Sequence, residues 1–148
     1  WQSMPELSVT LLGSNATEKV FALESDERVK VTGYIADVTP YFLSHRVFVA
    51  PLRYGAGMKG KIGQSLEYGL PIVSTAIGIE GMNLTNAENV LEADRAEEFA
   101  RAIIRLCQEP NLWQKLADNS DSALSPFSAP SVRQKIQQKF DSLVKVKL

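Results

Sequence analysis

Two lysines lie beside a glycine-rich bend in the middle of the chain, and this combination favours binding of a phosphate group. Gly55 and Gly57 have no Cβ atom, so the backbone can approach a ligand closely there. A helix predicted to begin at about Met58 would add unpaired N–H groups and the positive end of its dipole. Lys59 and Lys61 oppose that dipole, so their presence needs another reason. The alternative is that both lysines are solvated surface residues.

Two common phosphate-binding motifs fit this stretch only in part. Residues 55–60 match G-x-G-x-x-G, but residues 51–54 separate them from the preceding strand, and the next strand ends at Thr75 rather than at an acid. Residues 55–61 match G-x-x-x-x-G-K, but Ile62 stands where a P-loop has the serine or threonine that binds magnesium. Neither motif therefore accounts for the bend.

Other reactive residues do not form a recognisable catalytic or metal site. His45 is the only histidine and precedes a predicted strand, so no Ser/His/Asp set can be built around it. No cluster of His, Cys, Asp and Glu has metal-ligand spacing. Cys107 falls on an apolar helical stripe and is most simply a small core residue; a single cysteine fits a reducing compartment. We expect no catalytic residue and no metal site within this chain.

The glycine bend lies inside a predicted strand–helix–strand unit. Apolar runs predict strands at residues 47–50 and 72–75, with a helix over about 58–68 between them. Further strands are predicted at residues 7–12, 29–32 and 89–92, and short helices at 17–23 and 37–43, the latter capped by Asp37. Strands alternating with helices predict an α/β fold: a doubly wound, Rossmann-like parallel sheet with helices on both faces.

The C-terminal third is predicted to be helical. Asp94 and Glu97 form a capping-box-like start, Pro110 begins a second helix, and residues 125–130 form a Pro/Ser-rich linker. A last helix carries the apolar stripe Val132, Ile136, Phe140 and Leu143, which we expect to pack on this domain's own edge or on a second copy. The chain is thus one domain, residues 1–148, with an α/β core and helical end (1–127) and a helical arm (128–148).

Composition limits the classes of function. The formal charge is −1 and the pI about 5.9, which argues against nucleic-acid binding. No apolar run approaches the roughly 20 residues that span a bilayer, and no secretory signal is visible. We expect a cytoplasmic protein, with peripheral membrane association as an alternative. The chain begins at Trp1 rather than methionine, which indicates a fragment or a processed product.

The stretch around the bend resembles the donor-binding half of GT-B glycosyltransferases of family 4, also called group 1. Residues 51–61 fit a P-x-R-x-G-A-G-x-K-x-K variant of the family pattern. Residues 64–73 fit its E-A-M-A-x-G-x-P-V-V frame, and residues 74–81 continue the match with S-T-A-I-G-I-E-G. The resemblance extends over about residues 7–124 and identifies the chain as a C-terminal donor-binding domain.

The resemblance implies transfer of a sugar from a nucleoside diphosphate sugar, usually with retention and without a metal. The nucleotide sugar is then the substrate, and no separate cofactor is expected. The acceptor and its catalytic residues would belong to the N-terminal domain of the same full-length protein, so this chain alone is expected to be inactive.

The resemblance also implies roles for particular residues. The two acids of the family's E-x7-E pattern are replaced by Ala56 and Gln64; the amide could still bind the ribose hydroxyls, whereas Ala56 cannot contact the sugar. The expected nucleobase neighbours are Tyr34 and Ile35. The expected donor-binding residues are Gly55, Ala56, Gly57, Met58, Lys59 and Gln64.

Family domains have one more strand and helix before residue 7, so a central strand is missing here. We therefore expect the strands at 7–12 and 47–50 either to close directly on each other or to pair across a homodimer. Two other functions stay open: a non-catalytic scaffold or interaction module, indicated by the loss of both acids, and a sugar-nucleotide epimerase, which can share the GT-B fold.

Overall fold

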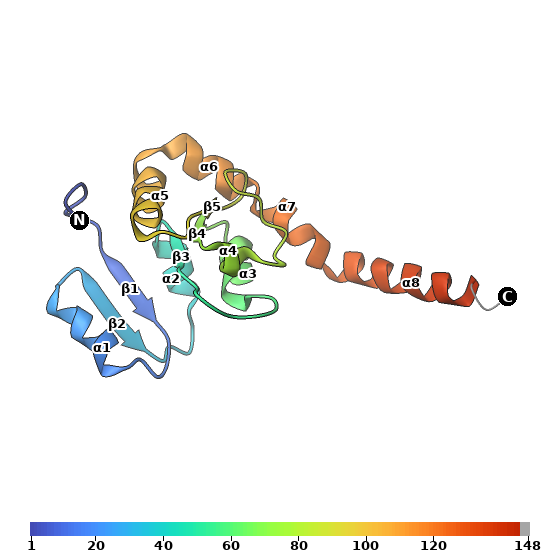
Figure 1. The fold of residues 1–148 in the computed structure, drawn as a ribbon, viewed down its shortest axis with the longest axis horizontal. Coiled ribbons are helices and arrows are strands. Elements are labelled where there is room, and N and C mark those ends of the chain that lie inside the picture. Colours follow the sequence, from blue (N-terminus) through green and yellow to red (C-terminus); the bar gives the residue numbers. More distant parts are fainter. Residues whose placement is uncertain (146–148) are drawn as a thin grey trace. The chain divides into compact units, whose positions relative to one another are not determined.

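The computed structural model describes residues 1–145, and the chain divides into two compact units. Unit 1 comprises Trp1–Ser44 and unit 2 begins at His45 (Figure 1). The elements of unit 1 are β1 (Val9–Leu12), α1 (Glu18–Phe21), the 3-10 helix η1 (Ala22–Ser25), β2 (Val29–Gly33) and α2 (Thr39–Ser44).

Unit 1 is built on a two-stranded parallel sheet. β1 and β2 pair from Val9 opposite Val29 to Leu12 opposite Gly33. The predicted cap of α2 is confirmed, because the Asp37 carboxylate accepts a hydrogen bond from the Thr39 N–H at 2.9 Å. The side chains of both strands are half-buried, apart from an exposed lysine on β2.

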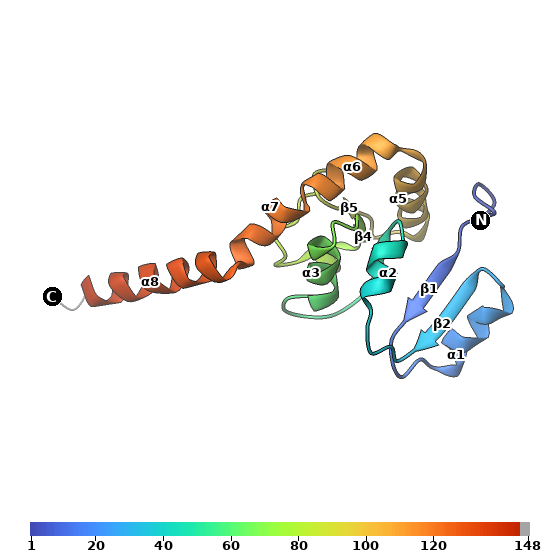
Figure 2. The ribbon, with the colours of Figure 1, turned by 180° about the vertical axis from the view of Figure 1, so that it is seen from behind.

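Unit 2 contains a three-stranded parallel sheet and most of the helices (Figure 2). The strands pair in the order β3–β4–β5. Its elements are β3 (Phe48–Ala50), α3 (Gly60–Glu67), β4 (Ile72–Ser74), α4 (Ala76–Ile79), β5 (Leu91–Glu92), α5 (Ala96–Gln108), α6 (Pro110–Asp118), α7 (Ser120–Leu124), the 3-10 helix η2 (Ser125–Phe127) and α8 (Ala129–Lys145).

The core of unit 2 lies on both faces of β4. Ile72 packs in a cluster with Ile62 and Leu66 of α3. The next residue, Val73, points to the opposite face and packs with Leu106 and other side chains of α5 and α6. Both strand residues are fully buried. Helices therefore cover both faces, and the predicted α/β, Rossmann-like class with parallel strands is confirmed.

The expected pairing of the first and third strands, directly or across a homodimer, stays a prediction. The ladders of hydrogen bonds in the described chain lie within the units, as β1–β2 in unit 1 and β3–β4–β5 in unit 2. β3 has only three residues and pairs with β4 along all of them.

The last helix does not pack on its own domain. Its stripe is exposed to solvent, at 40% for Val132, 53% for Ile136, 63% for Phe140 and 57% for Leu143. α8 extends away from the sheet of unit 2 (Figure 1), so no other described element lies along this stripe. The predicted linker at 125–130 is instead η2 and the first turn of α8. No helix within residues 1–145 is both long and apolar enough to cross a membrane.

Candidate functional site

The carboxyl ends of β3 and β4 are joined by side-chain hydrogen bonds. The Ser74 hydroxyl donates to the carbonyl of Ala50 at 3.2 Å, and the Thr75 hydroxyl donates to the carbonyl of Leu52 at 2.6 Å. Thr75 also accepts from the Gly78 N–H at 3.3 Å and so caps α4. These bonds fix the start of the loop that carries the glycine bend. Neither hydroxyl residue was predicted to belong to the site, although threonine is a residue type favoured at helix N-caps.

The glycine bend requires glycine because of its backbone. Gly55 has φ 138° and Gly57 has φ 73°, conformations that side chains with a Cβ rarely adopt. A Cβ built on either residue would meet no atom within 4 Å, so open space lies in front of both. Ala56 and Met58 are exposed as well. The predicted loop is thus accessible to a ligand along its length.

The first turn of α3 retains free hydrogen-bond donors. The N–H groups of Ile62 and Gly63 donate to the Lys59 carbonyl at 3.0 and 3.1 Å. The N–H groups of Gly60 and Lys61 have no acceptor within the described part of the chain. No side chain caps the helix, whose N-cap residue is Lys59. Free N–H groups at a helix N-terminus bind anions.

Lys59 supplies a cation at the same place. Its backbone N–H donates to the sulfur of Met82 at 3.3 Å, which ties the start of α3 to the turn after α4. Its Nζ atom is buried and has no hydrogen-bond partner among residues 1–145. Burying an unpaired ammonium is costly, and an anion bound beside it would remove that cost. Met82, which is 2% exposed, was not singled out by the sequence.

Gln64 lies on the outer face of α3, as expected. It is half-buried, whereas Ile62 and Leu66 face the sheet and are each 1% exposed. The Lys61 ammonium donates to Gln64 Oε1 at 3.2 Å. Lys61 is itself exposed, so the two lysines of the motif differ. Lys61 is solvated and holds Gln64, whereas Lys59 is half-buried and its ammonium is buried without a partner among the described residues.

The expected nucleobase neighbours follow β2 in unit 1. Gly33 ends the strand with φ 67°, Tyr34 is 76% exposed and Ile35 is half-buried. They therefore lie at the carboxyl end of a parallel strand, where α/β sheets bind ligands. The glycine bend and α3 belong to unit 2.

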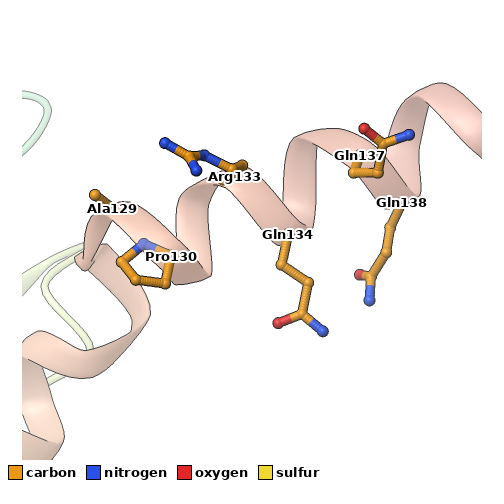
Figure 3. A pocket seen from close by; sticks show the side chains of 6 residues that line it. All are labelled: Ala129, Pro130, Arg133, Gln134, Gln137 and Gln138. Atoms are coloured by element: carbon orange, nitrogen blue, oxygen red, sulfur yellow. The ribbon is translucent and has the colours of Figure 1, made fainter.

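Other parts of the molecule offer less chemistry. Within residues 1–145 no group of three His, Cys, Asp or Glu side chains lies close enough to hold a metal ion. An open hollow follows the polar side of α8 (Figure 3), where Gln134 and Gln138 extend to one side and Arg133 and Gln137 to the other. Three amides and a guanidinium provide neither a nucleophile nor an acid–base pair.

The geometry of the site indicates the class of protein, and the comparison with protein families indicates the family. A glycine loop at the carboxyl edge of a parallel sheet, followed by a helix with free N–H groups, is typical of phosphate- and nucleotide-binding α/β domains. The family model "Glycosyl transferases group 1" matches residues 2–109. The chain therefore belongs to the group 1 glycosyltransferases. Comparison with curated protein sequences gave no match.

Solved structures share the fold. HepE from Anabaena in complex with UDP has a TM-score of 0.78 at 17% identity, over 93% of this chain and 42% of that protein. The sucrose-phosphate synthase from Thermosynechococcus elongatus has a TM-score of 0.76 at 20% identity, over 97% and 40%. The C-terminal domain of the group 1 glycosyltransferase LpcC from Francisella tularensis has a TM-score of 0.59 at 17% identity, over 73% and 57%. The chain spans about two fifths of the first two proteins.

Proposed function

We propose that this chain binds the nucleoside diphosphate of a sugar donor and serves as the donor-binding domain of a glycosyltransferase. The observation that carries the proposal is the buried, unpartnered ammonium of Lys59 at a helix start with two free N–H groups. A diphosphate would pair that cation and occupy those donors together. Family membership supports a sugar nucleotide as the source of the diphosphate, and the UDP complex of HepE makes UDP the first ligand to test.

The remaining parts of the proposal rest on the family resemblance. Gln64 binds the ribose hydroxyls, the backbone of residues 55–59 cradles the diphosphate, and the nucleobase lies by Tyr34 and Ile35. The acceptor binds to an N-terminal domain of the full-length protein. The resemblance also implies that transfer proceeds with retention and without a metal. In place of a metal, Lys59 and the N–H groups of α3 would neutralise the leaving diphosphate.

The test is a calorimetric titration of UDP, GDP, ADP and the matching nucleosides into the chain and its variants. Lys59→Ala is expected to weaken binding of the best diphosphate by about 1–3 kcal/mol, the usual contribution of a hydrogen bond to a charged group. The nucleoside should lose much less, because it lacks the phosphates. Lys30→Ala removes an exposed lysine of β2 and is the matched control. Equal losses for nucleotide and nucleoside would remove Lys59 from this role.

One observation favours a second function. Neither acid of the E-x7-E pattern is present, since Ala56 and Gln64 occupy their positions. A domain that kept its packing but lost its chemistry would act as a scaffold or interaction module. If none of the three diphosphates binds at millimolar concentration to the chain or to the full-length protein, the scaffold function replaces the donor-binding function.

A further inference from the structure

The glycine loop, residues 53–58, has no hydrogen bonds of its own. All six residues are exposed, and none of them makes a hydrogen bond within residues 1–145. A segment without such bonds is held only at its ends and opens at little cost in free energy. Ordering a loop when a ligand binds reduces the affinity, so the bonds that fix the two ends of this loop affect binding at the site.

One short segment holds both ends of the glycine loop. The carbonyl of Leu52, just before the loop, accepts from the Thr75 hydroxyl at 2.6 Å. The N–H of Lys59, just after the loop, donates to the sulfur of Met82 at 3.3 Å. Thr75 and Met82 lie at the two ends of α4 and the turn that follows it, and the Met82 N–H donates back to the carbonyl of Ile79 at 3.0 Å. The loop is therefore attached at both ends to α4 and its turn.

The bond from Thr75 is the stronger of the two attachments, because a thioether sulfur is a weak acceptor. The carbonyl of Leu52 has no other hydrogen-bond partner among residues 1–145. Thr75 is 8% exposed, and its backbone N–H donates to the carbonyl of Ala50 at 3.3 Å, which fixes it against the end of β3. Its hydroxyl therefore determines where the chain leaves β3 and enters the loop.

We propose that Thr75 is a positioning residue of the phosphate site, whose hydroxyl holds the glycine loop in the conformation that receives a diphosphate beside Lys59. Thr75 acts through Leu52 and not on the ligand, because its side chain is buried and its proton is donated to that carbonyl. This inference rests on the proposed donor-binding function. It assigns to a buried residue the shape of a loop that is otherwise unsupported.

The experiment is calorimetric titration with the diphosphate that binds best among UDP, GDP and ADP, and with its nucleoside. Thr75→Val keeps the shape of the side chain and removes the hydroxyl, so it should weaken diphosphate binding about fivefold to twentyfold. Affinity for the nucleoside should change by less than about twofold, because it has no phosphates. Thr75→Ser restores the hydroxyl and should keep diphosphate binding within about twofold of the unaltered chain.

A control is needed for α4, because Thr75→Val also removes the side chain that caps it. The Asp94 carboxylate accepts from the Ala76 N–H at 2.9 Å, a second bond to the first turn of α4. Asp94→Ala removes this bond and leaves the bond to Leu52 in place. It should not weaken diphosphate binding, since it also removes a negative charge.

Limited proteolysis tests the position of the loop without a ligand. Arg53 is the first residue of the loop and is exposed, so trypsin cleavage after it reports on the end that Thr75 holds. Thr75→Val should speed this cleavage about threefold or more, and Thr75→Ser should not. Cleavage after Arg101, an exposed residue of the core helix α5, reports on unfolding of unit 2 and should stay slow in both variants.

The inference is overturned if Thr75→Val binds the diphosphate as tightly as the unaltered chain, if Thr75→Ser does not retain binding, or if Asp94→Ala causes the same loss. If Thr75→Val does not fold, Thr75→Cys takes its place, because a thiol is only a weak donor and should also lower diphosphate affinity. Failure of the proposed function has a different result: the unaltered chain then binds none of the three diphosphates, and Thr75 has no ligand to position.

Discussion

At the scale of single residues, Gln64 is the position where the site departs most informatively from its family pattern. It occupies the place of a glutamate, and the Lys61 ammonium already donates to its Oε1. Gln64→Glu would add charge-assisted bonds both to ribose hydroxyls and to Lys61, and such bonds are roughly twice as strong as neutral ones. We expect Gln64→Glu to tighten nucleotide binding and Gln64→Ala to loosen it, as measured by calorimetric titration.

Neither Gln64 change should unfold the domain, because the side chain faces away from the Ile62–Leu66 core side of α3. We therefore expect the melting temperatures of both Gln64 variants to lie within about a degree or two of that of the unaltered chain. Glu67→Gln changes an exposed acid of the same helix and is the control for net charge. If affinity is the same in all three variants, Gln64 is a surface residue and the scaffold function gains support.

Asp26 gives a pH dependence to the stability of unit 1. The Arg28 side chain donates to its carboxylate, with Nε at 2.8 Å from Oδ1, and the Arg28 backbone N–H donates as well. These bonds lower the pKa of Asp26 from 3.8 to about 2. Since the unfolded chain binds the proton more tightly, this stabilisation is complete above about pH 4 and is lost as pH falls through about 2.

The measurement is urea unfolding followed at several values between pH 2 and pH 6. Asp26→Asn should flatten the acid limb of the stability profile, because no carboxylate is left to protonate. Glu27→Gln removes the neighbouring exposed acid and should leave the limb in place. An unchanged limb in Asp26→Asn would show that other carboxylates determine acid unfolding.

At the scale of elements, the contact between β4 and α4 fixes the strand edge beneath the site. A Cβ added at Gly78 would lie 2.0 Å from Ser74 Oγ, a distance that forces the side chain or the helix to move. Gly78→Ala should therefore destabilise the domain by about 1–3 kcal/mol, the usual cost of overpacking. In a Ser74→Ala background the clash is removed, so the same change should cost less.

A double-mutant cycle in urea separates this clash from the hydrogen bonds that Ser74 makes to Ala50 and Thr75. Gly60→Ala is the control, because nothing lies within 4 Å of its added Cβ and alanine favours helix. Additive costs for Gly78→Ala and Ser74→Ala would show that α4 shifts freely and that the close contact does not constrain it.

The sequence predicted the elements that have their own apolar pattern. All five strands were predicted from short apolar runs, and each is found within two residues of its expected limits. α4 and α7 were missed, because helices of four and five residues form through tertiary contacts rather than through periodicity. Asp94 was predicted to cap α5, but its carboxylate accepts from the Ala76 N–H at 2.9 Å instead.

The sequence predicted which residue types form the site, but it did not predict which of their atoms are buried. Gly55, Gly57 and Lys59 follow from local chemistry, whereas the loss of solvent at Lys59 Nζ depends on how the chain folds around it. Its neighbour Met82 is 23 positions away in sequence and comes from the turn after α4. No pattern in one sequence encodes that contact. The different roles of Lys59 and Lys61 likewise follow only from the fold.

At the scale of the whole molecule, the two units differ in how much apolar surface they bury. Both clusters of buried apolar residues belong to unit 2 and surround its three-stranded sheet. In unit 1 the strands are half-buried, and Phe21, Leu23 and Leu43 are exposed. A two-stranded sheet needs a further strand or a helix packed on it to be stable in water.

We therefore expect the backbone amides of β1 and β2 to exchange with deuterium about a hundredfold faster than those of β4, because local opening of a small core costs less free energy than global unfolding. The measurement is hydrogen–deuterium exchange of the whole chain, with peptides covering Val9–Leu12, Val29–Gly33 and Ile72–Ser74. α3 and α5 supply the internal reference, since their apolar faces are buried in the core of unit 2. If β1 and β2 exchange as slowly as β4, the two units open in one cooperative step, and the sheet of unit 1 is stabilised by more than its own half-buried side chains.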